Sequence, residues 1–186
     1  MKYRTIVIDP PWKLDSLPER FGESRSSHAP KWDERYETMS DEEIRNFPIN
    51  DFADKNCDLF LWVTHRTLPL GLDIIKSWGF KYHLLITWDK ERGLVRFGFH
   101  RRTEFAIYAY RGKMGLEQTG KSMNTIIRVL YTKHSEKPNL FYTILARHTK
   151  EPRIDIFARK RHEGFEPWGK EVDLALVTLG AFIIDK

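Results

Sequence analysis

Short apolar runs alternate along the chain with polar stretches that carry helix-start signals. A continuous run rich in β-branched residues that ends at a proline or a polar cluster is typical of a buried strand. The chain has such runs at residues 4–8, 59–63, 80–88, 104–110, 126–131 and 154–157. They predict the strands of a sheet, with a basic loop between the third strand and the fourth.

Helix signals fall between several of these runs. Residues 40–43 (Ser-Asp-Glu-Glu) form a capping box and predict a short helix. Residues 67–78 predict a longer helix, with Pro69 in its first turn and Gly79 after its end. A third helix is expected to start at Pro138. Strands that alternate with helices predict an open α/β sheet with helices on its faces, in which ligands bind at the carboxyl ends of the strands.

Composition narrows the class of protein. The chain has 186 residues, enough for one domain, and 41% of them are hydrophobic, which argues against disorder. No apolar run is long enough to cross a bilayer, and the N-terminus leads directly into a strand. We therefore expect an intracellular, cytoplasmic protein of a prokaryotic cell or a viral host, without a membrane partner. The single cysteine, Cys57, has no partner for a disulfide or a zinc site, so we expect a buried thiol and no metal.

Basic residues are unevenly distributed. The formal net charge is +5, and Lys, Arg and His gather in residues 96–102 and 147–162. Such clusters suit a polyanionic partner such as nucleic acid, but a solvated surface is the simpler explanation for either cluster alone. Charge therefore permits a nucleic-acid partner without requiring one.

The sequence Asp9-Pro10-Pro11-Trp12 directly follows the first predicted strand, where this type of sheet carries its chemistry. Methylation of the exocyclic amine of adenine needs two acceptors for its N–H groups, because they draw the nitrogen toward tetrahedral geometry and free its lone pair. The Asp9 carboxylate and the Pro10 carbonyl supply such a pair, and consecutive prolines hold that carbonyl rigid. Trp12 can stack on an extruded base, which is worth about 1–3 kcal/mol. A strand-ending turn is the alternative explanation for these residues.

Further motifs follow in a fixed order. They lie at residues 36–44, 59–64, 78–80, 86–88, 104–107, 134–138 and 168–169. Together with residues 9–12 they resemble the MT-A (seventy-kilodalton-subunit) family of adenine N6-methyltransferases, over residues 3 to about 172. The resemblance implies a Rossmann-like class I methyltransferase fold, an α/β sheet with helices on both faces, with the catalytic motif ahead of the cofactor motifs. It also implies S-adenosylmethionine as cofactor and a methyltransferase domain at 1–172. The tail at 173–186 lies beyond the resemblance, and its apolar runs at 174–177 and 181–184 predict that it completes the sheet or forms an interface.

Cofactor contacts are implied by the same resemblance. Pro138 is expected to open the helix beside the cofactor, and Arg159 matches a basic residue that contacts it. Gly169-Lys170-Glu171 lies where the family places its ribose-binding pair, although Lys170 replaces the usual asparagine. Arg111 matches a lysine that pairs with the cofactor's carboxylate. Simple surface charges are the alternative for the basic residues. The expected cofactor-binding set is Asp9, Arg111, Pro138, Arg159, Arg161, His162, Gly169, Lys170 and Glu171.

Substrate contacts are expected from the motifs and from the basic residues near them. Tyr36 and Glu104 stand in motif segments, with packing and a salt bridge as the respective alternatives. His100, Arg101 and Arg102 are expected to contact phosphates, unless they only form a solvated loop. The expected set is Trp12, Tyr36, His100, Arg101, Arg102, Glu104 and Lys121. A compact chain without an appended RNA-binding domain resembles relatives that modify DNA, so DNA is favoured over RNA. A second copy or a related subunit is a candidate partner.

Residues 115–122 (Gly-Leu-Glu-Gln-Thr-Gly-Lys-Ser) also fit the phosphate-binding-loop pattern of nucleotide hydrolases. Such a loop must open a helix, whereas residues 126–131 predict a strand. We therefore expect Lys121 to face phosphates of a nucleic acid instead. A non-catalytic nucleic-acid-binding subunit on the same fold is the other alternative, but degenerate subunits of this family lose the motif that is intact at residues 9–12.

Overall fold

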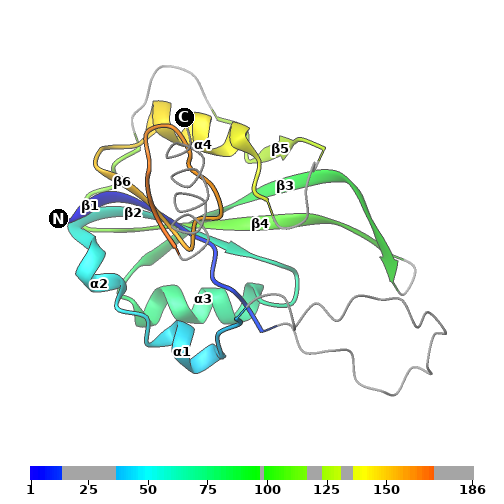
Figure 1. Ribbon diagram of the computed structural model, residues 1–186, viewed down its shortest axis with the longest axis horizontal. Helices are drawn as coiled ribbons and strands as arrows, with labels where there is room; N and C mark the ends of the chain where they lie inside the picture. Colours follow the sequence, from blue (N-terminus) through cyan, green and yellow to red (C-terminus); the bar gives the residue numbers. More distant parts are fainter. Residues whose placement is uncertain (14–36, 97–98, 117–122, 131–135, 170–186) are drawn as a thin grey trace, which may run out of the picture.

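The computed structural model describes residues 1–13, 37–96, 99–116, 123–130 and 136–169, and of residues 92–96 only the backbone. The described residues form a seven-stranded sheet in the order β5-β3-β4-β2-β1-β6-β7 (Figure 1). The strands are β1 (Tyr3–Ile8), β2 (Ala53–Val63), β3 (Lys81–Arg96), β4 (Phe99–Arg111), β5 (Ile126–Arg128), β6 (Arg153–Ile156) and β7 (Glu166–Trp168). Every predicted run is confirmed as a strand, and β7 is additional. Because β5 and not a helix follows residues 115–122, the phosphate-binding-loop alternative lacks the helix it needs.

β1 lies in the interior of the sheet, with its carboxyl end between two parallel neighbours. It runs parallel to β2 on one side and to β6 on the other. The chain leaves β1 toward one side of the sheet and returns on the other, and ligands bind at such switch points. β4 runs antiparallel to both β2 and β3, so the sheet is mixed. Asp9, which directly follows β1, is thereby placed at the switch point.

Helices cover both faces of the sheet. α1 (Asp41–Arg45), α2 (Ile49–Phe52) and α3 (Leu68–Ser77) lie on one face, and α4 (Asn139–His148) lies on the other (Figure 1). Side chains of β1 alternate between two cores: Ile6 and Ile8 pack in the core that contains residues of α3, whereas Val7 packs with residues of α4. The α/β fold class is confirmed. Among the described residues, none of the helices has the length and apolar character needed to span a bilayer.

Local signals account for the helix ends. The Ser40 hydroxyl accepts the amide of Glu43, and the Glu43 carboxylate accepts the amide of Ser40, which is the predicted capping box of α1. Pro69 lies in the first turn of α3, and Gly79 follows its end with φ 79°. Pro138 is the N-cap of α4. The predicted helices are therefore confirmed, and α2 is a single turn that the pattern does not predict.

The β3–β4 hairpin extends beyond the apolar runs that predict it. Main-chain pairing continues as far as Arg96 opposite Phe99, so the prediction of a basic loop is wrong. The pattern misses this part because apolar residues mark only the section that packs on the core. An irregularity around Glu91, which has φ 60°, separates the core section from a section that projects past the helices (Figure 1). We call this projecting section, residues 94–96 and 99–102, the arm.

Candidate active site

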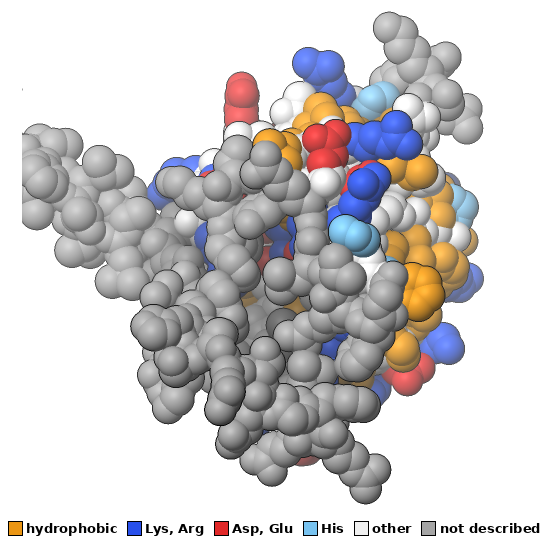
Figure 2. Space-filling view, turned by 90° about the vertical axis from the view of Figure 1, so that its right-hand side faces the viewer, with side chains coloured by type: hydrophobic (Ala, Val, Ile, Leu, Met, Phe, Trp, Pro, Cys, Tyr) orange, Lys and Arg blue, Asp and Glu red, His pale blue; other side chains and the backbone are white. Residues whose placement is uncertain are grey.

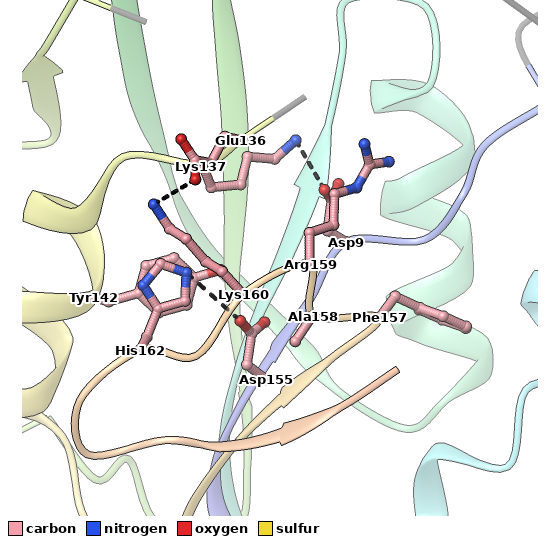
Figure 3. A pocket seen from close by; sticks show the side chains of 10 residues that line it. All are labelled: Asp9, Glu136, Lys137, Tyr142, Asp155, Phe157, Ala158, Arg159, Lys160 and His162. Atoms are coloured by element: carbon pink, nitrogen blue, oxygen red, sulfur yellow. Dashed lines mark ion pairs between the residues drawn. The ribbon is translucent and has the colours of Figure 1, made fainter. Parts of the chain in front are cut away.

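A hollow lies at the carboxyl ends of β1 and β6, and side chains from separate parts of the chain reach it (Figure 3). Asp9 follows β1, and Lys137 comes from the segment before α4. Tyr142 lies on α4, Asp155 on β6, and Arg159 in the turn after β6. The hollow therefore coincides with the switch point of the sheet, where ligands of this type of fold bind.

Two charged side chains of this hollow, Asp9 and Lys137, continue into a chain of ion pairs that extends to Glu104 and Lys90 on the sheet. The Lys137 ammonium lies 3.0 Å from Oδ2 of Asp9 and 3.2 Å from Oε2 of Glu104 on β4. The other oxygen of Glu104, Oε1, lies 3.0 Å from the ammonium of Lys90 on β3. Lys137 also lies over the ring of Trp62, 5.2 Å from its centroid, which is a cation–π distance. Because water reaches these groups only in part, the charges must be balanced by one another.

The pKa shifts of these groups follow from burial and from their partners. Burial raises the pKa of Asp9, and the cations of Lys137 and Arg159 oppose this shift without cancelling it. Burial favours the neutral form of Lys137, but the carboxylates of Asp9 and Glu104 outweigh it, and its pKa is raised. Burial also opposes ionisation of Glu104, yet Lys137 and Lys90 lower its pKa overall. Lys137 is therefore a persistent cation and Glu104 a persistent anion, whereas Asp9 is the member whose charge is most easily lost.

Backbone hydrogen bonds hold the proline-containing motif after β1 in place. The Trp12 amide donates to the Pro10 carbonyl at 2.8 Å, and the Met39 amide donates to the Pro11 carbonyl at 2.9 Å. A carbonyl oxygen has two lone pairs, so Pro10 retains one for another donor. The indole N–H of Trp12 donates to the Trp62 carbonyl at 3.0 Å, which ties the half-buried ring to the end of β2. The motif thus presents its acceptors on a fixed backbone.

The other side of the hollow is formed by Asp155 and two stacked rings. The rings of Tyr142 and His162 have centroids 3.4 Å apart and planes at 7°. Burial raises the pKa of Asp155 to about 8, against the opposing hydrogen bond from Tyr142. Burial lowers the pKa of His162 to about 4, so its Nε2, 3.9 Å from Asp155, carries no charge at neutral pH. This side therefore offers a protonated carboxyl and aromatic surface, next to the ion pair of Lys160 and Glu136 at 2.9 Å.

The turn after β6 packs closely on β7. Phe157 has φ 62°, which residues with a side chain rarely adopt, and Ala158 donates its amide to the Trp168 carbonyl at 3.0 Å. A Cβ on Gly169 would lie 2.8 Å from the Ala158 carbonyl oxygen, so a larger residue would force the two strands apart. Packing alone therefore explains the glycine at position 169, whose contact with the cofactor stays a prediction.

The residues at the hollow fit the predicted cofactor, but little space between them is free. Lys137 can pair with a carboxylate and Asp9 with an ammonium, the two charged groups at the amino-acid end of S-adenosylmethionine. The protonated carboxyl of Asp155 can donate to a hydroxyl or accept from one. The free volume within the hollow is about 20 Å³, and about 270 Å³ when the space open to solvent is included. Ligand sites usually exceed about 300 Å³, so the hollow in this conformation is smaller than a typical site for a ligand of this size.

The structure brings only part of the predicted set to this site. Those that lie at the hollow or in its ion-pair network are Asp9, Glu104, Arg159 and His162. Pro138 is buried at the start of α4, directly after Lys137, whereas Arg161 is exposed and does not line the hollow. His100, Arg101 and Arg102 are exposed on the arm. The predicted residues outside the described part of the chain are Tyr36, Lys121, Lys170 and Glu171, as is the tail at 173–186.

Arg111 lies at the opposite end of the sheet, which contradicts its predicted pairing with the cofactor. It ends β4 and pairs with the buried Cys57, near the start of β2, because β4 runs antiparallel to β2. Its guanidinium donates to the main-chain carbonyls of Asp54 and Ala53 and to the side-chain oxygen of Asn50. Arg111 therefore fastens the end of β4 to the segment that enters β2.

Several residues of the site are missing from the predicted set, among them Lys137, Asp155, Tyr142 and Lys90. Lys137 stands inside the motif at residues 134–138, so the motif signals it, although the resemblance gives a role only to Pro138 of that motif. Asp155 is an acidic residue within an apolar run, and a carboxyl buried in this way is a functional candidate. Lys90 has no comparable signal, because only the pairing of β3 with β4 brings it to Glu104.

Fold and site together define an α/β protein of the Rossmann-like methyltransferase type, with its hollow at the carboxyl ends of the strands. A family model described as MT-A70 matches residues 3–171. The chain therefore belongs to the MT-A70 family.

Individual relatives agree with this assignment. The chain is 26% identical over 185 residues to the type II methyltransferase M.MunI of Mycoplasma sp, covering 92% of this chain and 78% of that protein. It is 28% identical over 190 residues to the human N(6)-adenine-specific methyltransferase METTL4, covering 91% of this chain and 37% of that protein. It is 28% identical over 169 residues to the human N(6)-adenosine-methyltransferase catalytic subunit METTL3, covering 85% of this chain and 26% of that protein. The chain thus spans most of M.MunI but only a minor part of the two human proteins.

Proposed function

We propose that this chain uses S-adenosylmethionine to methylate the N6 amine of adenine in DNA. Membership of the MT-A70 family, with relatives named as N6-adenine methyltransferases, supports the class of reaction. The observation that carries the proposal for the site is the position of Asp9. Its carboxylate lies at the end of an interior strand, beside a rigid proline carbonyl and within 3.0 Å of the Lys137 ammonium.

In this proposal, Asp9 and Pro10 hold the target amine. The Asp9 carboxylate accepts one N–H, and the remaining lone pair of the Pro10 carbonyl accepts the other. Because backbone hydrogen bonds already fix the motif, these acceptors need no reorganisation as charge develops on the nitrogen. The Trp12 ring, anchored through its N–H, leaves a partly exposed aromatic surface near them for an extruded base.

Other residues of the hollow hold the cofactor. When bound, S-adenosylmethionine supplies an electrophilic methyl group on a positively charged sulfur. Lys137 pairs with its carboxylate, and the protonated carboxyl of Asp155 bonds a ribose hydroxyl. Arg159 rotates to admit the ligand and covers it. The ribose contacts proposed for Lys170 and Glu171, and the substrate contacts proposed for Tyr36 and Lys121, extend this set.

The arm favours DNA as the nucleic acid. His100, Arg101 and Arg102 lie on a projecting two-stranded ribbon, and the major groove of duplex DNA admits such a ribbon. The corresponding groove of an RNA helix is too narrow for side chains to read. Figure 2, which views the side toward which the arm points, shows basic side chains interspersed with acidic and apolar ones. Among the side chains that Figure 2 draws in colour, the basic ones do not form one broad patch, so we assign the proposed contact to the arm.

Matched oligonucleotides test the proposal. The protein is incubated with labelled S-adenosylmethionine and with DNA or RNA of the same sequence, single- or double-stranded, and digested products are separated by mass spectrometry. We expect label in N6-methyladenine from DNA, with unpaired or distorted adenines favoured because extrusion costs a few kcal/mol. Label found only in N6-methyladenosine would show that RNA, and not DNA, is the substrate. Absence of both products, with no heat on titration of the cofactor, would instead indicate a non-catalytic subunit.

A further inference from the structure

The ammonium of Lys137 is shared between two carboxylates, and only one of them belongs to the proline motif. It lies 3.0 Å from Asp9 and 3.2 Å from Glu104. We propose, on the basis of the function proposed above, that Glu104 is a positioning residue: anchored by Lys90, it competes with Asp9 for Lys137. The position of Lys137 then sets whether Asp9 is free to accept the amine of adenine.

Asp9 already has a cationic partner in this structure. Lys137 contacts Oδ2 of Asp9, so that oxygen already accepts from an ammonium. The Lys137 and Asp9 side chains are only 11% and 15% exposed, so water offers little replacement for a lost partner. An amine that takes the place of Lys137 on Oδ2 competes with it directly, and an amine on the other oxygen, Oδ1, meets a carboxylate already paired with an ammonium. In either case, binding costs least where Lys137 has a second anion at hand.

Glu104 is built to be that second anion. Each of its carboxylate oxygens has its own lysine, Lys90 at 3.0 Å on Oε1 and Lys137 at 3.2 Å on Oε2. Lys90 comes from β3, which pairs with β4 here, and its ammonium lies 6.0 Å from the centroid of the Trp88 ring. Glu104 is thus held from the sheet side on one oxygen, while its other oxygen faces Lys137.

The mobile partner is Lys137 itself. Asp9 is fixed by the backbone of the proline motif, and Glu104 lies within a paired strand. Lys137 belongs neither to that motif nor to a strand, and its side chain is a flexible four-carbon stem. Its ammonium has three donors, enough to bridge both carboxylates or to move wholly onto one. The directions of the pKa shifts agree with this, because Lys137 and Glu104 stay charged while burial holds Asp9 close to protonation. The cation of Arg159 also lowers the pKa of Asp9, and it is left in place in every variant that tests this competition.

Opposite substitutions around Glu104 test the competition in the protein without cofactor. The pKa of the Asp9 carboxyl is followed by carbon NMR over a pH titration. Glu104→Gln leaves Lys137 only Asp9, so we expect a lower pKa for Asp9. Lys90→Met leaves Glu104 only Lys137, so we expect a higher one. Lys81→Met, which removes an exposed charge from the same strand outside the network, should leave it unchanged.

A double-mutant cycle separates competition from a direct field of Glu104 on Asp9. In a Lys137→Met background, or in Lys137→Gln if that variant does not fold, the response of Asp9 to Glu104→Gln should shrink to less than about a third. An undiminished response, or no response in either single variant, overturns the proposal. Single-turnover methylation by Glu104→Gln should slow at least about tenfold because Lys137 stays on Asp9. The NMR result does not depend on turnover, so failure of the proposed function and failure of this competition give different outcomes.

Discussion

Two cations at opposite ends of the same sheet, Arg111 and Lys137, differ in what surrounds them. Arg111 donates to two main-chain carbonyls and one amide oxygen, and its guanidinium lies 5.3 Å from the ring centroid of Phe80. Lys137 contacts two carboxylates, one of them on the proline motif. Around Arg111 the acceptors are neutral, so no negative charge would remain if the cation moved. Around Lys137 the acceptors are carboxylates, and their negative charge becomes available to a ligand's hydrogen-bond donors once the cation moves. The first arrangement stabilises the fold, and the second prepares a site.

The sharpest test of this difference is removal of charge from Asp9 itself. Asp9→Asn keeps the shape of the side chain but turns one acceptor into a donor, so the amine loses its charged partner. By analogy with the loss of one oxyanion-hole donor, we expect methylation to fall by at least about 100-fold. Nucleoside mass spectrometry measures the loss, and an unchanged unfolding temperature shows that the fold is intact. Near-normal turnover would remove Asp9 from the chemistry.

Removal of each cation in a separate variant is the next test. Lys137→Met should weaken S-adenosylmethionine binding at least about tenfold, because one charge-assisted pair is lost. Arg111→Met should leave binding within about twofold and lower the free energy of unfolding by about 1–3 kcal/mol, because partly buried carbonyls lose their donor. Calorimetric titration and urea unfolding measure the two effects. The comparison fails if Arg111→Met is the variant that loses cofactor affinity.

The carboxyl at the hollow, Asp155, should also make the stability of the protein depend on pH. Burial raises the pKa of Asp155 from 3.8 in an exposed aspartate to about 8, so the folded state binds a proton that the unfolded state has released. The contribution of the protonated Asp155 to the free energy of unfolding is therefore fully present below about pH 4 and is lost as the pH rises through about 8. Urea midpoints measured across this range should fall for the wild type and change less for Asp155→Asn. Equal slopes for the two proteins would contradict a protonated Asp155.

The smallest effects are expected on the arm. Arg101→Ala should reduce the slope of log affinity against log salt by about 0.9, the value for one phosphate contact on duplex DNA. Arg102 donates to Asp89 at 2.8 Å, so its loss also disturbs the hairpin and is harder to interpret. Arg45→Ala, on an exposed position of α1, is the matched control. A salt slope that changes equally in both variants would show that the arm has no special contact.

Sequence alone predicts the elements better than their direction. The run at 4–8 and the motif after it lead correctly to the carboxyl end of an interior strand, because parallel α/β sheets place their sites there. The prediction that Arg111 binds the cofactor fails because β4 runs antiparallel to β2, so residues near the end of β4 lie beside the amino end of β2. Apolar spacing carries no information on strand direction. For the same reason, the sequence does not predict the contact of Lys90 with Glu104, which depends on how β3 pairs with β4.

The interior position of β1 has a consequence for assembly of the domain. Thr5, near the start of the chain, pairs with Arg153 of β6, so one edge of the first strand stays open until most of the sequence is available. Contacts between residues so far apart in sequence slow folding. A fragment that ends before β6 would expose this edge and leave the motif without half of its support, so catalytic competence should emerge only with the nearly complete chain.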